Sequence, residues 1–336
     1  MNDHEIIVVE GLTKVFNKSL VAVDHIDFTV KENEIFGFLG PNGAGKTTTI
    51  NMLITVLKPT EGKATVCGYD IEKQAKEVRS SIGVVPQEYT ADEDLTGLEN
   101  ILLCADLYGI PRKISKERAD ELLKLVELSK FKDKKVEIYS GGMRRRLELA
   151  CGLINRPKIL FLDEPTLGLD VQTRTATWGY IRQLKEEFGM TLFMTTHYLE
   201  EADNLCGRIA LIDHGKLIAL GRPNKLKESL GGDIMTLALE HKDADVTSLI
   251  EKMSQVREVK KQDGTYRIKV ENGEETAPQI LNSLIEEGYK VVKLSLTKPT
   301  LDEVYLEYTG KSMREETETQ ESMFSKRMTM RKARRR

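Results

Sequence analysis

The segment GPNGAGKTTT, residues 40–49, places a lysine and a threonine directly after a run of glycines. The glycines let the backbone turn so that successive N–H groups point inward, where they can bind phosphate oxygens. In this pattern Lys46 reaches the β- and γ-phosphates of a nucleoside triphosphate, and the Thr47 hydroxyl is placed for Mg²⁺. The residues expected to contact the nucleotide here are Gly40, Pro41, Asn42, Gly43, Ala44, Gly45, Lys46, Thr47 and Thr48.

The flanking sequence predicts the elements that such a loop needs. Residues 35–39, IFGFL, form a short apolar run suited to a buried strand, and residues 50–57, INMLITVL, have the apolar spacing of a helix. A helix after the loop adds the positive end of its dipole to the phosphate site. A glycine-rich turn that matches the pattern by chance is disfavoured, because the strand and the helix are both present.

A second segment supplies the acids that phosphate chemistry needs. Residues 158–165, KILFLDEP, read as a buried strand that presents Asp163 and Glu164 at its carboxyl end. In an open α/β sheet, ligands lie beyond the carboxyl ends of the strands. Asp163 is expected to hold Mg²⁺ through its water shell, and Glu164 to activate the attacking water as a general base. The alternative is a strand that ends in a solvated acid pair.

Composition limits the class of protein. The chain has 336 residues, a formal net charge of −3 and 40% hydrophobic residues, which describes a chain with a sizeable core and no global attraction to nucleic acid. It contains no apolar run of the roughly 18–20 residues that cross a bilayer, and its first residues lack the pattern of a signal peptide. The four cysteines are widely spaced and predict neither a zinc site nor a disulfide framework. We therefore expect a cytosolic chain.

The pattern around residue 140 selects among nucleotide-binding families. GTPases need an [NT]KxD motif to read the base, and neither NKLK at 224–227 nor TKPT at 297–300 contains the aspartate. Together with the glycine loop, SGGM at 140–143 followed by FLDEP at 161–165 resembles the ATP-binding cassette family. The resemblance covers roughly residues 5–225.

The resemblance implies roles for four further residues. Phe16 lies where the family places an aromatic ring under adenine, and Gln87 matches the glutamine that links the metal site, through water, to a membrane partner. Asp170, in LGLD, stands in the position of the family's D-loop. His197 matches the histidine that grips the γ-phosphate, although a lone histidine after a strand is more often structural.

The signature segment, residues 139–150, reads YSGGMRRRLELA. In the family the signature residues Ser140, Gly141 and Gly142 bind the γ-phosphate held by the opposite subunit, so two copies are expected to close head to tail around ATP. Two residues depart from the common LSGGQ, because Tyr139 replaces leucine and Met143 replaces glutamine. A methionine makes no strong hydrogen bond, so no role is carried over to it.

Three consecutive arginines, Arg144, Arg145 and Arg146, follow the signature. They can be read as a basic binding patch. The preferred interpretation is a partly solvated helix face, with Arg146 in the ion-pair position that the family usually gives to an arginine.

The resemblance implies the fold class and the domains. Residues 1–225 are expected to form an α/β P-loop NTPase cassette, with a RecA-like core, an antiparallel β edge and a helical subdomain at about 88–155. Residues 226–310 are expected to form a small α+β domain. The remaining segment, 311–336, is polar, and its last twelve residues hold seven lysines or arginines and no acid. It is predicted to be a disordered tail.

The expected order of elements in the second domain is β-α-β-β-α-β, which is the order of a ferredoxin-like domain. Its parts are a strand at 233–241, a helix at 243–253, a hairpin at 256–271 with an Asp-Gly turn, a helix at 277–288 and a strand at 289–296. A role in dimer support or docking is favoured over the binding of a regulator.

YSGGMRRRLELA and TLDEVYLEYTG, residues 300–310, resemble the daunorubicin-resistance-type branch of the family. That branch implies a cassette that serves a separate membrane permease and exports a drug-like or lipid-like compound. The chain would then lie in the cytoplasm, held at the inner face of the membrane through the permease.

Alternative functions remain at this point. One is a soluble cassette ATPase that acts on the ribosome or on nucleic acid, although this chain has one glycine loop, one signature and no heptad run. Another is a regulatory module in which the C-terminal domain senses a ligand. The basic tail is either a solvated end or a contact to anionic lipid, and no specific nucleic acid is expected.

Overall fold

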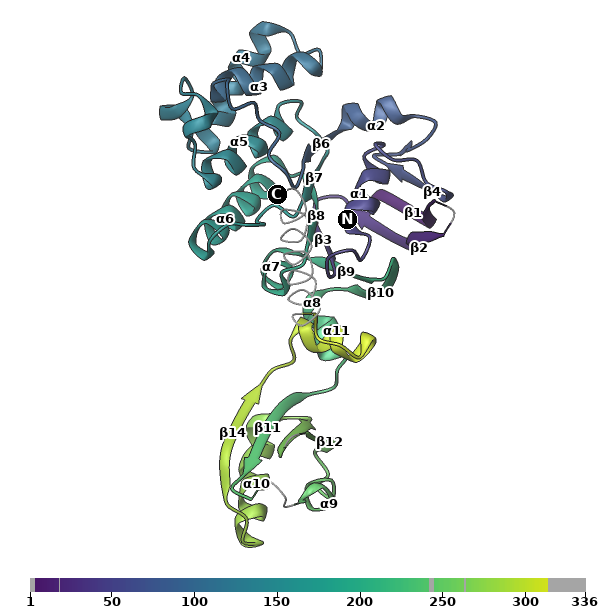
Figure 1. The fold of residues 1–336 in the computed structure, drawn as a ribbon, viewed down its shortest axis with the longest axis vertical. Coiled ribbons are helices and arrows are strands. Elements are labelled where there is room, and N and C mark those ends of the chain that lie inside the picture. The colour runs from purple at the N-terminus through teal and green to yellow at the C-terminus, as the bar shows by residue number, and fades with distance from the viewer. Residues whose placement is uncertain (1–3, 18, 242–244, 263, 314–336) are drawn as a thin grey trace, which may run out of the picture. The chain divides into compact units, whose positions relative to one another are not determined.

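The computed structural model describes residues 4–17, 19–241, 245–262 and 264–313. By its internal contacts the chain divides into two compact units, one built on Met1–Pro223 and the other on Asn224–Arg314 (Figure 1). The predicted basic tail lies outside the described residues from 314 onwards.

The first unit is built on a six-stranded sheet in the order β10-β9-β3-β8-β7-β6. All neighbouring strands pair in parallel except β9 and β10. Parallel sheets are covered on both faces, and every residue of β3, β7 and β8 is accordingly buried. The strands are β3 (Ile35–Leu39), β6 (Ile82–Val85), β7 (Ile159–Asp163), β8 (Thr191–Thr196), β9 (Arg208–Asp213) and β10 (Lys216–Gly221).

A second, antiparallel sheet in the order β2-β1-β4-β5 completes the β structure of this unit. Its buried residues share one core cluster with those of β3, β7 and β8. This arrangement confirms the predicted α/β fold class with an antiparallel β edge. The strands are β1 (Glu5–Phe16), β2 (Leu20–Lys31), β4 (Glu61–Val66) and β5 (Tyr69–Asp70), and α1 (Lys46–Leu53) and α2 (Ala75–Ser81) follow β3 and β5 in the chain.

Aromatic rings fill the centre of this core. Phe193 of β8 is fully buried, and its ring lies 5.3–6.2 Å from the rings of four other phenylalanines, which are Phe28, Phe36, Phe38 and Phe161. The rings bring together one strand of the antiparallel sheet and three of the parallel sheet. The aromatic contacts therefore hold the two sheets in one core.

Three helices of the first unit begin at polar residues whose side chains cap them. Thr96 forms a capping box with Glu99 at the start of α3, Ser140 caps α5, and Asp170 caps α6. Two of these three caps are residues predicted to be functional. The helices are α3 (Gly97–Leu107), α4 (Arg112–Leu125), α5 (Gly141–Leu153), α6 (Val171–Phe188) and α7 (Leu199–Leu205), with 3₁₀ turns at Ser129–Phe131 and Val136–Ile138; α8 (Pro223–Glu228) spans the boundary between the units.

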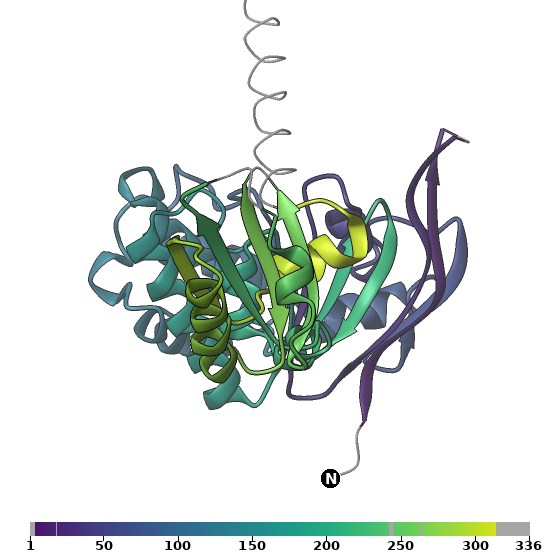
Figure 2. The same cartoon turned by 90° about the horizontal axis from the view of Figure 1, so that it is seen from below.

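The second unit contains a four-stranded antiparallel sheet in the order β12-β13-β11-β14, whose strands lie side by side in Figure 2. The succession of elements and the strand order are those of the predicted ferredoxin-like domain. The elements are β11 (Asp233–Leu239), α9 (Thr247–Ile250), β12 (Val256–Gln262), β13 (Thr265–Val270), α10 (Gly273–Glu286), β14 (Val291–Thr297) and α11 (Leu301–Thr309).

One prediction for this unit is wrong in extent. Of the helix expected at 243–253, the described residues form only the four-residue α9, Thr247–Ile250, and residues 243 and 244 lie outside the described residues. The apolar residues Val246 and Ile250 are buried in the core of the unit, so a single turn is enough to place both. The predicted hairpin is present, because Gln262 pairs with Thr265, while Asp263 of its turn lies outside the described residues.

Among the described residues, no helix combines the length and the apolar character that crossing a bilayer requires.

The aromatic core generates a stability prediction. Replacing Phe193 with Ala should lower the free energy of unfolding by about 3–5 kcal/mol, because it empties the space between four rings. Urea denaturation followed by circular dichroism measures this change. The matched control is Phe188→Ala at the end of α6, where the side chain is half exposed, and it should cost less than about 1 kcal/mol. Equal losses in both variants would contradict this view of the core.

Candidate functional site

The parallel sheet brings the predicted motifs to one edge. The glycine loop follows β3, Asp163 ends β7, and His197 follows β8. Since β8 pairs with both β3 and β7, Leu39 lies opposite Thr196, and Asp163 lies opposite Thr195. Three segments that are far apart in sequence therefore meet beyond the carboxyl ends of adjacent strands.

Side chains at several glycines of the loop would be strained or would clash with neighbouring backbone atoms. Gly43 and Gly45 have φ angles of +78° and +106°. A Cβ atom on Gly45 would lie 2.5 Å from the carbonyl oxygen of Ala22, and one on Gly40 would lie 2.2 Å from that of Ile212. The loop thus needs glycine at these places both for its conformation and for its close packing. It leads directly into α1, and this arrangement fits a phosphate group.

Lys46 is buried at the first position of α1. Its Nζ donates hydrogen bonds to the carbonyl oxygens of Gly40 at 2.8 Å and Pro41 at 3.1 Å, and it pairs with Glu164 Oε1 at 3.1 Å. Burial lowers the pKa of Lys46, and the charge of Glu164 opposes this effect. A cation held this way inside the loop is a ready partner for phosphate oxygens.

Glu164 connects the lysine to the histidine. Its Oε2 lies 3.1 Å from Nδ1 of His197, and all three side chains are buried. Burial by itself would raise the pKa of Glu164, but the hydrogen bond from His197 and the charge of Lys46 outweigh it and lower that pKa. The backbone of Glu164 is left-handed, with φ +47°, which is a strained conformation of the kind found at functional sites.

Asp163 is bound by two hydroxyl groups. Thr47 Oγ1 donates to Asp163 Oδ1 at 3.3 Å, and Thr195 Oγ1 donates to the same oxygen. Burial raises the pKa of Asp163, while both hydroxyl contacts act to lower it. In the described part of the chain, no three His, Cys, Asp or Glu residues cluster as a protein-only metal site. One hydroxyl and one carboxylate are the sparse oxygen ligands that suit Mg²⁺ beside phosphates.

Thr195 is a site residue that the sequence analysis missed. Its hydroxyl donates to Asp163 and also accepts a hydrogen bond from the backbone N–H of Glu164 at 3.0 Å. It therefore orients both acids. The sequence signal was the Thr-Thr pair directly before His197, at the carboxyl end of an apolar strand.

Glu201 is a second residue that sequence reasoning passed over. It is fully buried in α7, and its Oε1 accepts from Thr166 Oγ1 at 2.8 Å and from Trp178 Nε1 at 3.0 Å. Burial raises its pKa. Thr166 lies between Glu164 and Asp170, so this carboxyl group ties that segment to α6 and α7.

Two predicted residues come from other elements. Phe16 ends β1 on the antiparallel sheet, half buried, and Lys14 Nζ lies 5.3 Å from the centre of its ring. Gln87 is exposed in the loop after β6. Within the glycine loop, Asn42 and Thr48 are half buried.

The signature residues open helix α5. Ser140 is exposed, and its Oγ accepts a hydrogen bond from the N–H of Met143 at 3.3 Å. A Cβ atom on Gly142 would lie 2.8 Å from Cγ2 of Thr173, whose N–H and hydroxyl both bond to Asp170. The signature and the Asp170 segment are therefore neighbours, although they precede and follow β7 in the chain.

Tyr139 adds an anchor before the signature. Its ring is buried, and its hydroxyl donates to the carbonyl oxygen of Phe131 at 2.7 Å. Leucine, the residue at this place in the common signature, has no such hydroxyl.

The arginine run differs from its prediction at the central residue. Arg145 is only 1% exposed, so it is not part of a partly solvated helix face. It is buried because its guanidinium donates hydrogen bonds to backbone carbonyl groups. Arg146 has the predicted ion pair, at 3.3 Å from Glu127, and Arg144 pairs with Glu93.

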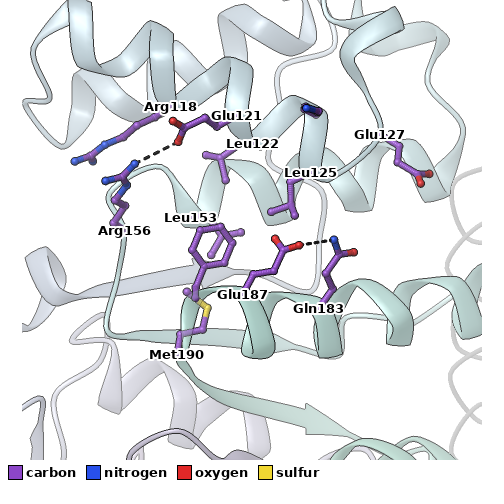
Figure 3. Close-up of a pocket in the computed structure, with 12 residues that line it drawn as sticks. Arg118, Glu121, Leu122, Leu125, Glu127, Leu153, Arg156, Gln183, Glu187 and Met190 are labelled. Atoms are coloured by element: carbon purple, nitrogen blue, oxygen red, sulfur yellow. Dashed lines mark hydrogen bonds and ion pairs between the residues drawn. The ribbon is translucent and has the colours of Figure 1, made fainter.

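A separate pocket of about 480 Å³ lies between α4 and α6 (Figure 3). Its apolar lining includes Leu122, Leu153 and Met190, and an ion pair between Arg156 and Glu121 lies at its rim. None of the predicted site residues lines it. This pocket is therefore distinct from the cluster around Lys46.

The position of Thr195 generates a prediction. Thr195→Val keeps the shape of the side chain but removes both hydrogen bonds, so Asp163 and the Glu164 backbone lose their orientation. ATP turnover should fall by at least about tenfold, equivalent to about 1.4 kcal/mol of the barrier. Phosphate release measures the rate, and Thr195→Ser, which keeps the hydroxyl, should restore most of it. A Val variant that turns over ATP like the parent would exclude this role.

Comparison with known proteins agrees with this geometry. The ABC transporter family model matches residues 23–167, and the model of the C-terminal domain of DrrA1-3-like ATP-binding proteins matches residues 221–309. The chain is 38% identical to the doxorubicin resistance ATP-binding protein DrrA of Mycobacterium tuberculosis, over 92% of this chain and 95% of that protein. It is 39% identical to the daunorubicin/doxorubicin resistance ATP-binding protein DrrA of Streptomyces peucetius, over 90% of this chain and 92% of that protein.

A solved structure shares the fold of the first unit. The ATP-binding cassette MJ0796, a dimer in a post-hydrolysis state with ADP and Pi, superposes with a TM-score of 0.58 at 28% identity. The match covers 64% of this chain and 98% of MJ0796. The motifs, the fold and the relatives agree, and the chain belongs to the ABC transporter family as an ATP-hydrolysing, ATP-binding subunit of the daunorubicin-resistance type.

Proposed function

We propose that this chain hydrolyses ATP between its own glycine loop and the signature of a second copy, and thereby drives a permease carried on a separate chain. The proposal rests on the buried cluster of Lys46, Glu164 and His197 at the carboxyl edge of the parallel sheet. An apolar, drug-like or lipid-like compound is the proposed cargo, which accords with relatives that are named for doxorubicin and daunorubicin resistance.

The glycine loop and its neighbours would hold MgATP. Lys46 and the loop N–H groups bind the β- and γ-phosphates, and Phe16 stacks under the adenine ring. Thr47 and Asp163 would hold Mg²⁺, with Gln87 reaching it through water. When bound, Mg²⁺ neutralises the charge that develops on the phosphate oxygens.

Glu164 is the proposed general base, and His197 the proposed γ-phosphate contact. The partners that lower the pKa of Glu164 keep its carboxylate ionised, which is the form that accepts a proton, but they also weaken it as a base. In the described arrangement it is paired with Lys46 and His197. Phosphate oxygens would compete for both partners, and this competition would free the carboxylate for water.

The second half of the site would come from another copy. Ser140, Gly141 and Gly142 present a hydroxyl group and N–H groups at the start of the 13-residue helix α5, where the helix dipole favours an anion. Asp170 lies beside them through Thr173, so both segments can face the partner subunit together. The dimeric state of the related MJ0796 cassette supports this arrangement.

The helical subdomain offers a surface for the permease. Leu103 and Leu107 of α3 are 46% and 81% exposed, and Tyr108 directly after them is 41% exposed. Tyr89, in the loop that contains Gln87, is also 41% exposed. An apolar surface beside the loop of Gln87 and Tyr89 would let a permease helix dock where its movement reaches the metal site.

The basic tail would strengthen attachment to the membrane. Each lysine or arginine near an anionic lipid surface contributes about 1 kcal/mol, and the last twelve residues hold seven. The chain would then be cytoplasmic and peripheral at the inner face of the membrane, bound through the permease with help from the tail.

The shared site generates a prediction about assembly. Glu164→Gln should form a dimer with MgATP, because ATP stays bound but is not hydrolysed. Ser140→Arg in the same background should stay monomeric, since the long side chain fills the phosphate position of the partner. Size-exclusion chromatography with light scattering gives the masses, and Ser129→Arg at a 3₁₀ turn of the same subdomain serves as control. A dimeric Ser140→Arg variant would contradict the proposed role across subunits.

Membrane attachment generates a second prediction. From native membranes solubilised in mild detergent, the tagged chain should co-purify with a multispanning protein in near-equal amount. Leu107→Asp should lower this yield at least about tenfold, whereas Val56→Asp, at another highly exposed apolar residue outside α3, should not.

A variant shortened to end at Met313 should still co-purify with the permease. It should no longer float with vesicles of phosphatidylserine and phosphatidylcholine, because it lacks the basic tail. Recovery with ribosomes or nucleic acid, and without any membrane protein, would replace the transporter proposal by the soluble alternative. If the shortened chain floats as well as the full chain, only the proposed contact between the tail and lipid is contradicted, and the transporter proposal stands.

A further inference from the structure

The loop after β6, residues 86–91, is bound by two buried side chains of the signature helix. Arg145 and Glu148 lie three residues apart on α5, so they share one face of the helix. They are only 1% and 3% exposed. Among the described residues, the side chains of Arg145 and Glu148 form hydrogen bonds only with this one loop, which we call the Gln87 loop.

Arg145 holds the first half of the Gln87 loop. Its Nη1 donates to the carbonyl oxygen of Pro86 at 2.8 Å, and its Nη2 donates to that of Gln87 at 2.9 Å. The guanidinium carbon lies 5.1 Å from the centre of the Tyr89 ring. The planar guanidinium thus binds two consecutive carbonyl groups through two separate nitrogens and also lies over an aromatic ring.

Glu148 holds the second half. Its Oε1 accepts from the N–H groups of Thr90 at 2.6 Å and Ala91 at 2.8 Å, and its Oε2 accepts from the Thr90 hydroxyl at 2.9 Å. Directly after the loop, the N–H of Asp92 donates to Asn100 of α3 at 2.8 Å. The far end of the loop is therefore attached to the helical subdomain as well.

A third contact joins the loop to the signature itself. The Tyr89 hydroxyl donates to the carbonyl oxygen of Gly141 at 3.3 Å. The loop is therefore attached to α5 at two places. Arg145 and Glu148 bind it to the body of the helix, and Tyr89 binds it to the start of the helix. Separating the loop from the helix would leave a buried cation and a buried anion without these partners, which is strongly unfavourable.

The neighbouring arginines show that this arrangement is specific to one position. Arg146 also binds a backbone carbonyl and an aromatic ring, but these belong to Val126 and to Tyr180. Arg144 binds Glu93 and the carbonyl groups of Glu137 and Tyr139. Only Arg145, among the three, points to the Gln87 loop.

We propose that Arg145 and Glu148 are positioning residues that make the Gln87 loop and the signature helix move as one body. A displacement of the loop by a docked permease helix would then shift Ser140–Gly142 at the face of the partner subunit. The flexible joint would lie at the junction of β6 with Pro86, ahead of the loop. This proposal rests on the proposed function, because it needs the signature to bind the nucleotide of a second copy.

The test uses the full chain carrying Glu164→Gln, with two readouts. Arg145→Met should speed amide exchange at Thr90 and Ala91 by at least about tenfold, measured by hydrogen exchange with mass spectrometry. It should also raise the ATP concentration for half-maximal dimerisation at least about tenfold. Binding of a fluorescent ATP analogue to the monomer should stay within about twofold, since the variant leaves the glycine loop unchanged.

Controls separate positioning from general loss of structure. Arg146→Met removes the same kind of side chain from the same helix without touching the loop, and its dimerisation should stay within about threefold of the parent. Glu148→Gln, which keeps an acceptor oxygen, should fall between the parent and Glu148→Leu. The double variant Tyr89→Phe, Arg145→Met should weaken dimerisation by a smaller factor than the product of the factors for the two single variants. The two effects overlap because both side chains join the same loop to the same helix.

The outcomes are distinct. Faster exchange with unchanged dimerisation in Arg145→Met would overturn the proposal, since the loop would then be free of the signature. Equal losses in Arg145→Met and Arg146→Met would also overturn it and indicate a general destabilisation of α5. If the Glu164→Gln parent itself does not dimerise with MgATP, the proposed function is contradicted. The proposed role of Arg145 and Glu148 is then contradicted as well, because it depends on that dimer.

Discussion

Strand β8 pairs in parallel with β3 on one side and with β7 on the other, and the site depends on this pairing. It brings the glycine loop, the acid pair and His197 to the same edge of the sheet. It also places Thr195 opposite Asp163, where one hydroxyl orients both acids. The pairing is held by the aromatic core around Phe193, which lies on β8 itself. Strand β8 therefore contributes both to the packing of the core, through Phe193, and to the site at the edge of the sheet, through Thr195.

The buried charges of the site compensate one another. Lys46, Glu164 and His197 are out of water, and burying such groups is costly unless they are paired. Lys46 is paired with Glu164 and with two loop carbonyl groups, so its charge is compensated in the absence of phosphate. In the proposed function, the phosphates of a nucleotide would replace these contacts of Lys46 with their own.

Charge plays a different part in the helical subdomain. Arg145 and Glu148 are also buried, but their hydrogen bonds go to backbone groups of the Gln87 loop. A hydrophobic pair would pack the helix equally well without binding the loop. The charged pair makes the loop part of the helix that carries the signature. Glu201 ties the segment after Glu164 to α6 and α7 in a similar way, through Thr166 and Trp178.

The sequence by itself determined the family, the fold class and, for the second unit, the β-α-β-β-α-β order of elements. Apolar runs that end in GPNGAGKT and in Asp163–Glu164 depend only on local spacing, and the SGGM signature is likewise local. Local spacing could not show that Arg145 is buried, because the carbonyl groups it binds lie near residue 86 and are brought to it by the fold. The same holds for Thr195, whose partner Asp163 lies on another strand. The tertiary structure alone decided these contacts, since strand register and helix packing determine which distant groups meet.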